Sequence, residues 1–186
     1  TYNEKENIEF LINEILKLKI PDLTIVVVDD NSPDGTGNLV RSLSKKDKSV
    51  FLLNREHNRG RGYAGKAGYL FCLRNGAEII IEMDADLSHN PRYLIPMMDK
   101  LRYADVVLGS RRVGGSEEVG RGIMRRFITY FANFYIRFLL GVSVKDCNSG
   151  YRCFSRKALL SISPETIDSK GPGIVQEVLF KAYLKG

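Results

Sequence analysis

The sequence predicts an α/β fold with a mostly parallel sheet and helices on both of its faces. Short runs of β-branched and other apolar residues alternate with stretches whose apolar residues recur at helical spacing, which is typical of repeated strand and helix units. The length of 186 residues suits one domain, so we expect residues 1–186 to share a single core. Hydrophobic residues make up 44% and charged residues 27% of the chain, which excludes disordered and fibrous classes.

Each expected element is bounded by charged or turn-forming residues. Strands are expected at residues 23–28, 50–53, 77–83, 105–108 and 151–154. Helices are expected at residues 7–18, 34–43, 63–75, 93–101, 123–140, from 156, and from 174 to the end. A helix that opens an α/β domain normally follows a strand. We therefore expect that a first strand precedes Thr1 and is missing from this chain, which is shortened at both ends.

Positive charge gathers in one window of the chain. Residues 111–126 hold five arginines and two glutamates, which contributes +3 of the net charge of +6. Clustered guanidinium groups bind phosphate, whether on a nucleotide, a nucleic acid or an anionic membrane. No helix-turn-helix, zinc-finger or RNA-recognition signature accompanies the cluster, so we expect no nucleic-acid partner.

The cysteines and the apolar runs argue against disulfide-rich, zinc-binding and membrane-spanning classes of protein. The three cysteines Cys72, Cys147 and Cys153 have no Cys-x-x-Cys spacing, which argues against a disulfide framework or a zinc site and favours a reducing compartment. The longest apolar-rich stretch, residues 127–142, is interrupted by polar residues. Since it is shorter than the roughly 18 residues of a membrane span, we expect no transmembrane helix.

The strongest chemical signal is the sequence MDADLSH at residues 83–89, directly after an expected strand. In extended backbone Asp84 and Asp86 lie on the same side, at the carboxyl end of a strand, where open α/β sheets bind ligands. Two such carboxylates bind Mg²⁺ or Mn²⁺, whose other positions are filled by water and substrate phosphates. A solvated loop before Pro91 is the plain alternative, but the position after a hydrophobic strand favours a metal and nucleotide diphosphate site.

A second acidic pair, Asp29 and Asp30, ends the expected strand at residues 23–28. A carboxylate in this position accepts hydrogen bonds from a nucleobase or a ribose hydroxyl, so we expect Asp30 to face a ligand. We expect Asp34 to form an Asx turn and to cap the next helix. An acidic pair after a strand also occurs in response-regulator receivers, but those have a single phosphoacceptor where this chain has D-x-D.

Residues 60–65, GRGYAG, satisfy the G-x-G-x-x-G spacing of a dinucleotide fingerprint. In that fingerprint the first glycine directly follows the first strand, whereas here a polar loop at residues 54–59 intervenes. We therefore reject this interpretation. The glycines are expected to allow close backbone approach and helix packing, with Arg59 or Arg61 near a phosphate.

Two further arginines are suited to bind a second phosphate group. Arg111 follows the strand expected at residues 105–108, and Arg125 lies at the start of the helix expected at residues 123–140, where their planar guanidinium groups favour phosphate. That helix is rich in Phe and Tyr and begins with basic residues, a pattern typical of helices at the surface of anionic membranes. An ordinary core helix remains the alternative.

Five segments, in this order and spacing, resemble glycosyltransferase family 2, and within it the dolichyl- and polyprenyl-phosphate mannose synthases. They are YNE at residues 2–4, VVVDDNSPD at 26–34, MDADLSH at 83–89, GSR at 109–111 and NSGYR at 148–152. The resemblance implies a type A glycosyltransferase fold and an inverting, metal-dependent transfer of mannose from GDP-mannose to a dolichyl or polyprenyl phosphate. It also implies a peripheral domain at the cytoplasmic face of a membrane.

The resemblance further implies roles for individual residues. Those matching the donor contacts are Tyr2, Glu4, Val28, Asp30 and Ala85. Those matching the ligands of Mg²⁺ or Mn²⁺ are Asp84, Asp86 and Ser88. Those matching the acceptor-phosphate contacts are Arg111, Arg125 and Thr129, so the catalytic set is Asp84, Asp86, Arg111 and Arg125. Glu177 lies where the family often has a Glu in its last helix.

Departures from the family pattern leave alternatives open. The chain ends at Gly186, before the basic residues that relatives use near the donor phosphates. A polyprenyl-phosphate glucose synthase or another family member that uses a UDP-sugar is one alternative, and a non-catalytic nucleotide-binding or membrane-docking subunit is the other. Processive polysaccharide synthases resemble one another in a Q-x-x-R-W motif, and this chain has no Trp.

Overall fold

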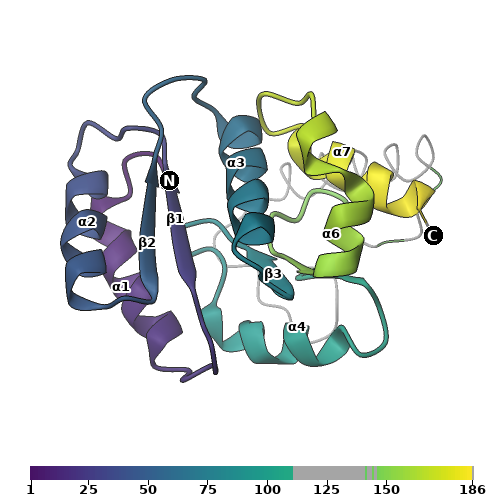
Figure 1. The fold of residues 1–186 in the computed structure, drawn as a ribbon, viewed down its shortest axis with the longest axis horizontal. Coiled ribbons are helices and arrows are strands. Elements are labelled where there is room, and N and C mark those ends of the chain that lie inside the picture. Colours follow the sequence, from purple (N-terminus) through teal and green to yellow (C-terminus); the bar gives the residue numbers. More distant parts are fainter. Residues whose placement is uncertain (111–140, 142–143, 145, 186) are drawn as a thin grey trace, which may run out of the picture.

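The computed structural model describes residues 1–110, 141, 144 and 146–185 (Figure 1). Its strands are β1 (Ile25–Asp29), β2 (Val50–Asn54), β3 (Ile79–Glu82), β4 (Val106–Leu108) and β5 (Arg152–Ser155). Its helices are α1 (Lys5–Leu16), α2 (Thr36–Lys46), α3 (Arg61–Arg74), α4 (Leu94–Lys100), α6 (Arg156–Ile162) and α7 (Ile174–Leu184). Two 3₁₀ turns are η1 (Pro91–Tyr93) and η2 (Pro164–Thr166).

The strands pair in two groups. β1 and β2 are parallel, from Ile25 opposite Val50 to Asp29 opposite Asn54. β5 lies between β3 and β4 and is antiparallel to both, so β3 and β4 run in the same direction. The predicted α/β class is confirmed, and so is the strand expected at residues 151–154, whose antiparallel direction the sequence pattern did not reveal.

Hydrophobic side chains cover both faces of the sheet, because successive residues of a strand point to opposite sides. In β5, Phe154 packs with buried side chains of α3, α6 and α7, whereas Cys153 packs with those of α1 and α4. A third cluster joins α1 and α2 to β1 and β2, at the left of Figure 1. The predicted placement of helices on both faces is therefore confirmed.

The predicted elements agree with the described ones to within a few residues. The helix expected from residue 34 begins at Thr36, because the Asp34 carboxylate accepts a hydrogen bond from the Thr36 N–H at 2.9 Å in an Asx turn. Gly35, with a φ of 90°, takes the N-cap position that was expected for Asp34. Among the helices that the structure describes, none is long and apolar enough to cross a membrane, and the helix expected at residues 123–140 lies outside them.

The first turn of α3 packs unusually closely against the loop that precedes α7. A Cβ on Gly60, whose φ is 126°, would lie 2.7 Å from the Lys170 carbonyl oxygen. The Gly62 N–H donates to that same oxygen at 3.1 Å, and a Cβ on Gly62 would overlap the Ser169 carbonyl oxygen. The prediction that these glycines allow close backbone approach is confirmed.

Gly62→Ala is expected to lower the free energy of unfolding by about 1–3 kcal/mol, because the added methyl group overlaps main-chain atoms that no side-chain rotation can move away. Gly171→Ala is the matched control, since it adds the same methyl group in the loop against which Gly62 packs, at a position where no atom lies within 4 Å of the added Cβ. Urea unfolding followed by circular dichroism measures both variants. Equal stability of the two variants would contradict the close packing.

Candidate active site

The carboxyl end of β1 carries a buried aspartate that shapes the following loop. Asp29 accepts hydrogen bonds from the N–H and hydroxyl of Ser32 at 2.9 and 2.6 Å. The same loop holds the start of the chain, because the Asn3 N–H donates to the Ser32 hydroxyl and the Glu4 N–H donates to the Thr36 hydroxyl, both at 3.0 Å. The segment that contains Tyr2 and Glu4 therefore lies beside the end of β1.

Asp30 connects three elements through its carboxylate. Its Oδ1 accepts from Arg55 Nη1 at 2.5 Å, and its Oδ2 accepts from the Gly60 N–H at 2.6 Å. Arg55 directly follows β2, and Gly60 directly precedes α3. Because Asp30 is only 6% exposed, these bonds are shielded from water and fix the start of α3 relative to β1. A contact of Asp30 with a nucleobase stays a prediction.

Asp84 and Asp86 follow β3, as predicted, in a loop that turns back on itself. The Asp84 N–H donates to His89 Nδ1 at 2.9 Å. The His89 ring stacks on Tyr151, with ring centroids 4.9 Å apart and planes inclined by 15°. The Tyr151 hydroxyl donates to the Asn90 carbonyl oxygen at 3.1 Å. Tyr151, from the segment NSGYR, thus supports the loop that carries both carboxylates.

Asp86 is held in its ionised form by the same loop. Burial raises the pKa of Asp86, but hydrogen bonds from Ser88 and the nearby His89 outweigh this effect and lower the pKa below its usual value. The Ser88 N–H donates to Asp86 Oδ1 at 3.0 Å. Leu87 between them has a φ of 62°, an uncommon left-handed conformation for a bulky residue that allows the tight turn. A role for Ser88 as a metal ligand stays a prediction.

Arg61, the first residue of α3, reaches across to the end of β3. Its Nη1 lies 3.0 Å from Asp84 Oδ1 and 3.5 Å from Glu82 Oε1. The Tyr69 hydroxyl donates to the other oxygen of Glu82 at 2.5 Å. Burial, and then the Glu82 carboxylate, raise the pKa of Tyr69 well above its usual value, so the hydroxyl keeps its proton. Glu82 is thereby fixed on one side and pairs with Arg61 on the other.

The segment NSGYR leaves room for this ion pair. A Cβ on Gly150 would overlap the Arg61 guanidinium and would lie 3.1 Å from Asp84 Oδ2. A residue with a side chain at position 150 would therefore displace Arg61 or Asp84. The glycine of this segment is explained by the packing of two charged side chains against its Cα atom.

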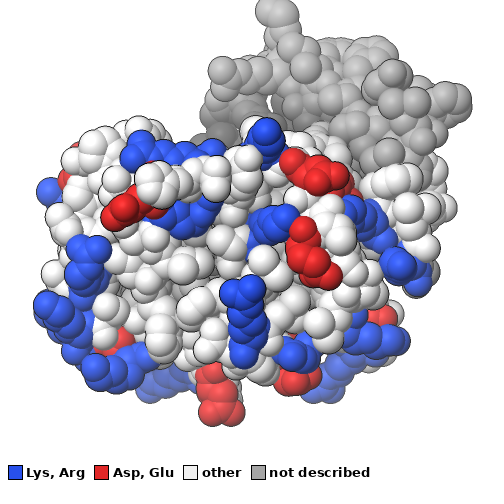
Figure 2. Space-filling view, turned by 45° about the horizontal axis from the view of Figure 1, so that its top comes forward, with Lys and Arg blue, Asp and Glu red and all other residues white. Residues whose placement is uncertain are grey.

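The start of α3 thus holds both acidic strand ends, since Gly60 binds Asp30 and Arg61 pairs with Asp84. In Figure 1 the loop after β2 enters α3 at the top of the molecule. Figure 2 brings the top forward and shows acidic and basic side chains next to one another on that face. The site is therefore a mixed-charge surface rather than a purely acidic one.

The two carboxylates of the D-x-D loop fit a divalent cation whose remaining ligands come from a substrate. Within the described ranges, no group of three or more His, Cys, Asp or Glu side chains is placed to hold a metal ion. Mg²⁺ and Mn²⁺ commonly bind to one or two carboxylates together with phosphate oxygens and water. The donor set of Asp84 and Asp86 matches that preference.

The sequence-predicted residues fall into three groups. The structure places Tyr2, Glu4, Val28 and Asp30 at or beside the end of β1. It places Asp84, Ala85, Asp86 and Ser88 in the loop after β3. The predicted acceptor-phosphate residues Arg111, Arg125 and Thr129 lie outside the described residues. Tyr2 is 54% exposed, so its ring is accessible to a ligand.

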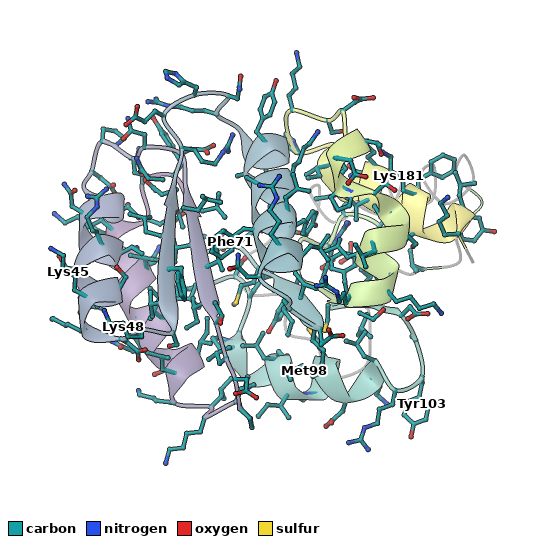
Figure 3. All side chains as sticks on the ribbon, viewed as in Figure 1. Lys45, Lys48, Phe71, Met98, Tyr103 and Lys181 are labelled. Atoms are coloured by element: carbon teal, nitrogen blue, oxygen red, sulfur yellow. The ribbon has the colours of Figure 1, made fainter. Side chains whose placement is uncertain are left out.

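Glu177 fixes the loop that precedes α7, a role that sequence reasoning missed. Its carboxylate accepts hydrogen bonds from the N–H groups of Asp168 and Ser169 at 3.0 and 2.8 Å. It also lies 3.2 Å from Nζ of Lys181, which is labelled in Figure 3. Glu177 therefore anchors the loop that packs against the first turn of α3. Its place in the family pattern was visible in the sequence, but its partners are main-chain atoms, which no side-chain motif reveals.

Comparison with known proteins identifies the family. A sequence profile described as Glycosyl transferase family 2 matches residues 1–162. The chain belongs to glycosyl transferase family 2. It is 37% identical over 186 residues to the undecaprenyl-phosphate mannosyltransferase of Micrococcus luteus, covering 100% of this chain and 76% of that protein. It is 40% identical over 188 residues to the polyprenol monophosphomannose synthase of Mycolicibacterium smegmatis, covering 100% of this chain and 71% of that protein.

Solved structures of the same architecture confirm the fold. The glucosyl-3-phosphoglycerate synthase of Mycobacterium tuberculosis in complex with Mn²⁺, UDP-glucose and phosphoglyceric acid aligns with a TM-score of 0.69 and 20% identity. The alignment covers 100% of this chain and 63% of the synthase chain, so this family 2 domain spans less than two thirds of that structure. The expected type A glycosyltransferase fold is confirmed by this likeness, which at such low identity shows the fold alone.

The Glu177 anchor predicts a pH-dependent contribution to stability. Burial raises the pKa of Glu177, but hydrogen bonds from Ser169, Asp168 and Lys181 outweigh it and lower the pKa to about 2, from a usual value of 4.5. The ionised carboxylate therefore stabilises the fold above pH 4.5, and this contribution is lost as the pH falls toward 2. Glu177→Gln is expected to lower the Tm most near neutral pH, with a deficit that shrinks below pH 4.5.

Differential scanning fluorimetry across this pH range measures the effect. Glu165→Gln is the matched control, because it makes the same substitution at an exposed position and is expected to leave the Tm unchanged at every pH. A deficit for Glu177→Gln that does not vary with pH would contradict the anchoring role of the ionised carboxylate.

Proposed function

We propose that this chain is a polyprenyl-phosphate mannosyltransferase, which transfers mannose from GDP-mannose to a dolichyl or polyprenyl phosphate with Mg²⁺ or Mn²⁺ bound. The observation that carries the proposal is that the start of α3 holds Asp30 and Asp84 together, at the ends of β1 and β3. A nucleotide sugar requires contacts to its nucleoside and a separate charged site at its diphosphate. The names of the relatives from Micrococcus luteus and Mycolicibacterium smegmatis support mannose as the sugar and a polyprenyl phosphate as the acceptor.

The donor lies across the two strand ends in this proposal. Tyr2, Glu4, Val28 and Asp30 contact the nucleoside, and Ala85 lies between the carboxylates that face the diphosphate. Asp84 and Asp86, with Ser88, hold the divalent cation, which when bound neutralises charge on the leaving diphosphate. His89 and Tyr151 keep the D-x-D loop in place, so the carboxylates are oriented before the donor binds.

The acceptor phosphate attacks the anomeric carbon from the face opposite the nucleotide. The new bond to the acceptor oxygen forms as the bond to the diphosphate breaks, and the configuration at the carbon inverts. A lipid phosphate is already an anion near neutral pH, so its attack requires no general base. This agrees with the site, because His89 Nδ1 accepts a hydrogen bond from the main chain and supports the loop.

We place the acceptor phosphate at Arg111, Arg125 and Thr129, since guanidinium groups bind phosphate through paired hydrogen bonds. Arg111 follows β4 after a two-residue segment, Gly109 and Ser110. The aromatic helix expected at residues 123–140 then faces the lipid, and the domain works as a peripheral protein at the cytoplasmic face of a membrane.

The decisive experiment is transfer of labelled mannose from GDP-mannose to a short polyprenyl phosphate, with and without Mn²⁺. Asp86→Asn is expected to reduce the rate by about 100-fold or more, because one of two carboxylate ligands is neutralised without a change of shape. Asp99→Asn on the exposed face of α4 is the matched control and is expected to retain the rate.

The outcomes separate the alternatives. Metal-dependent mannolipid that is lost in Asp86→Asn supports the proposal. Transfer from UDP-glucose in place of GDP-mannose would keep the reaction type and overturn the donor. Nucleotide binding without transfer from either donor would favour the non-catalytic subunit.

A further inference from the structure

Arg61 occupies a locally unfavourable position in the first turn of α3. A cation in the first turn of a helix is repelled by the positive end of the helix dipole. The N-cap residue Gly60 offers no side-chain cap, and the first turn of α3 contains no acidic residue. The charge of Arg61 is therefore offset by residues outside its own helix, and these are the carboxylates of Glu82 and Asp84.

The Arg61 guanidinium is held in place by Glu82 and Gly150, in addition to its pair with Asp84. Glu82 pairs with it at 3.5 Å, and Glu82 is itself fixed by the Tyr69 hydroxyl at 2.5 Å. Gly150 packs against the guanidinium at a point where a Cβ would overlap it. The side chain of Arg61 is 28% exposed, and that of Asp84 is 39% exposed. Arg61 is thus a partly buried cation with a defined position, in contrast to a solvated surface arginine.

The same guanidinium contacts a carboxylate oxygen of Asp84, a predicted metal ligand. Arg61 Nη1 lies 3.0 Å from Asp84 Oδ1, which is within hydrogen-bonding distance for a guanidinium and a carboxylate. We propose that Arg61 is an internal counter-ion of Asp84, which competes with a divalent cation for this carboxylate and makes the metal bind weakly unless an anionic nucleotide is bound with it. The inference rests on the proposed function, because it assumes that Asp84 is a metal ligand.

The charges around the site give the physical reason. Two carboxylates, those of Glu82 and Asp84, face the Arg61 guanidinium. The buried Arg152 lies opposite Glu82 in the β3–β5 pairing and has the Asp146 carboxylate as a further anion nearby. Arg61 therefore already offsets negative charge at Asp84, so a divalent cation alone has to bind beside a positive charge. A diphosphate brought by the nucleotide supplies negative charge to the cation and offers Arg61 a second anionic partner. Metal and nucleotide are then expected to strengthen each other's binding, reciprocally.

The test is a titration of the protein with Mn²⁺ alone, in which electron paramagnetic resonance measures the free ion. Arg61→Met removes the guanidinium and keeps an unbranched side chain, and it is expected to bind Mn²⁺ roughly tenfold more tightly than the unaltered protein, since a full charge is removed beside the ligand. Arg61→Lys keeps the charge and is expected to stay within about threefold of the unaltered protein. Arg74→Met removes a charge from an exposed position in the last turn of the same helix and is expected to leave Mn²⁺ binding unchanged.

The second arm repeats the titrations with GDP, and with UDP in parallel, at saturating concentration. The nucleotide that binds is expected to increase the Mn²⁺ affinity of the unaltered protein by a larger factor than that of Arg61→Met. Thermal unfolding of each variant tests whether the fold is retained. If Arg61→Met does not fold, Arg61→Lys serves as the test variant. A loss of Mn²⁺ affinity greater than about threefold in Arg61→Lys contradicts a role in charge alone.

The results distinguish this inference from the proposed function. Unchanged or weaker Mn²⁺ binding in Arg61→Met, with binding lost in Asp84→Asn, would overturn the counter-ion and leave the metal site standing. Equal factors of nucleotide enhancement in the unaltered protein and Arg61→Met would also overturn it. Absence of Mn²⁺ binding in the unaltered protein and in Arg61→Met, with either nucleotide present, would overturn the metal site and this inference together.

Discussion

The site depends on the first turn of α3, where three consecutive residues contact three separate parts of the chain. Gly60 donates to Asp30 at the end of β1, Arg61 pairs with Asp84 after β3, and Gly62 donates to the loop before α7. Among the described strands, β1 and β2 do not pair with β3, β4 or β5. α3 contacts both groups, as α1 does, and its first turn links the two acidic strand ends directly.

Charge balance follows from this geometry. A purely acidic loop would bind a divalent cation whether or not substrate is present, but here a guanidinium shares the carboxylates. Burial strengthens these interactions because the surrounding dielectric is lower than that of water. The proposed donor carries a diphosphate, so a guanidinium that already pairs with Asp84 favours binding of the cation and the donor together.

The segment NSGYR supports the site through packing and hydrogen bonds. Gly150 makes room for Arg61 and Asp84, and Tyr151 stacks on His89 of the D-x-D loop. Arg152 is buried, and its Nε donates to the Ser149 carbonyl oxygen at 2.8 Å. The motif was recognised in the sequence through its resemblance to the family, whereas these packing roles became clear only from the contacts.

The sequence by itself determined the α/β class, the positions of most helices and strands, and the placement of the D-x-D loop after a strand. These features follow from local periodicity and from the residues that end each element. Only the tertiary structure decided the antiparallel place of β5, the burial of Asp30, and the pairing of Arg61 with Asp84. Contacts between residues far apart in the chain depend on strand register and helix packing, for which a single sequence contains no local signal.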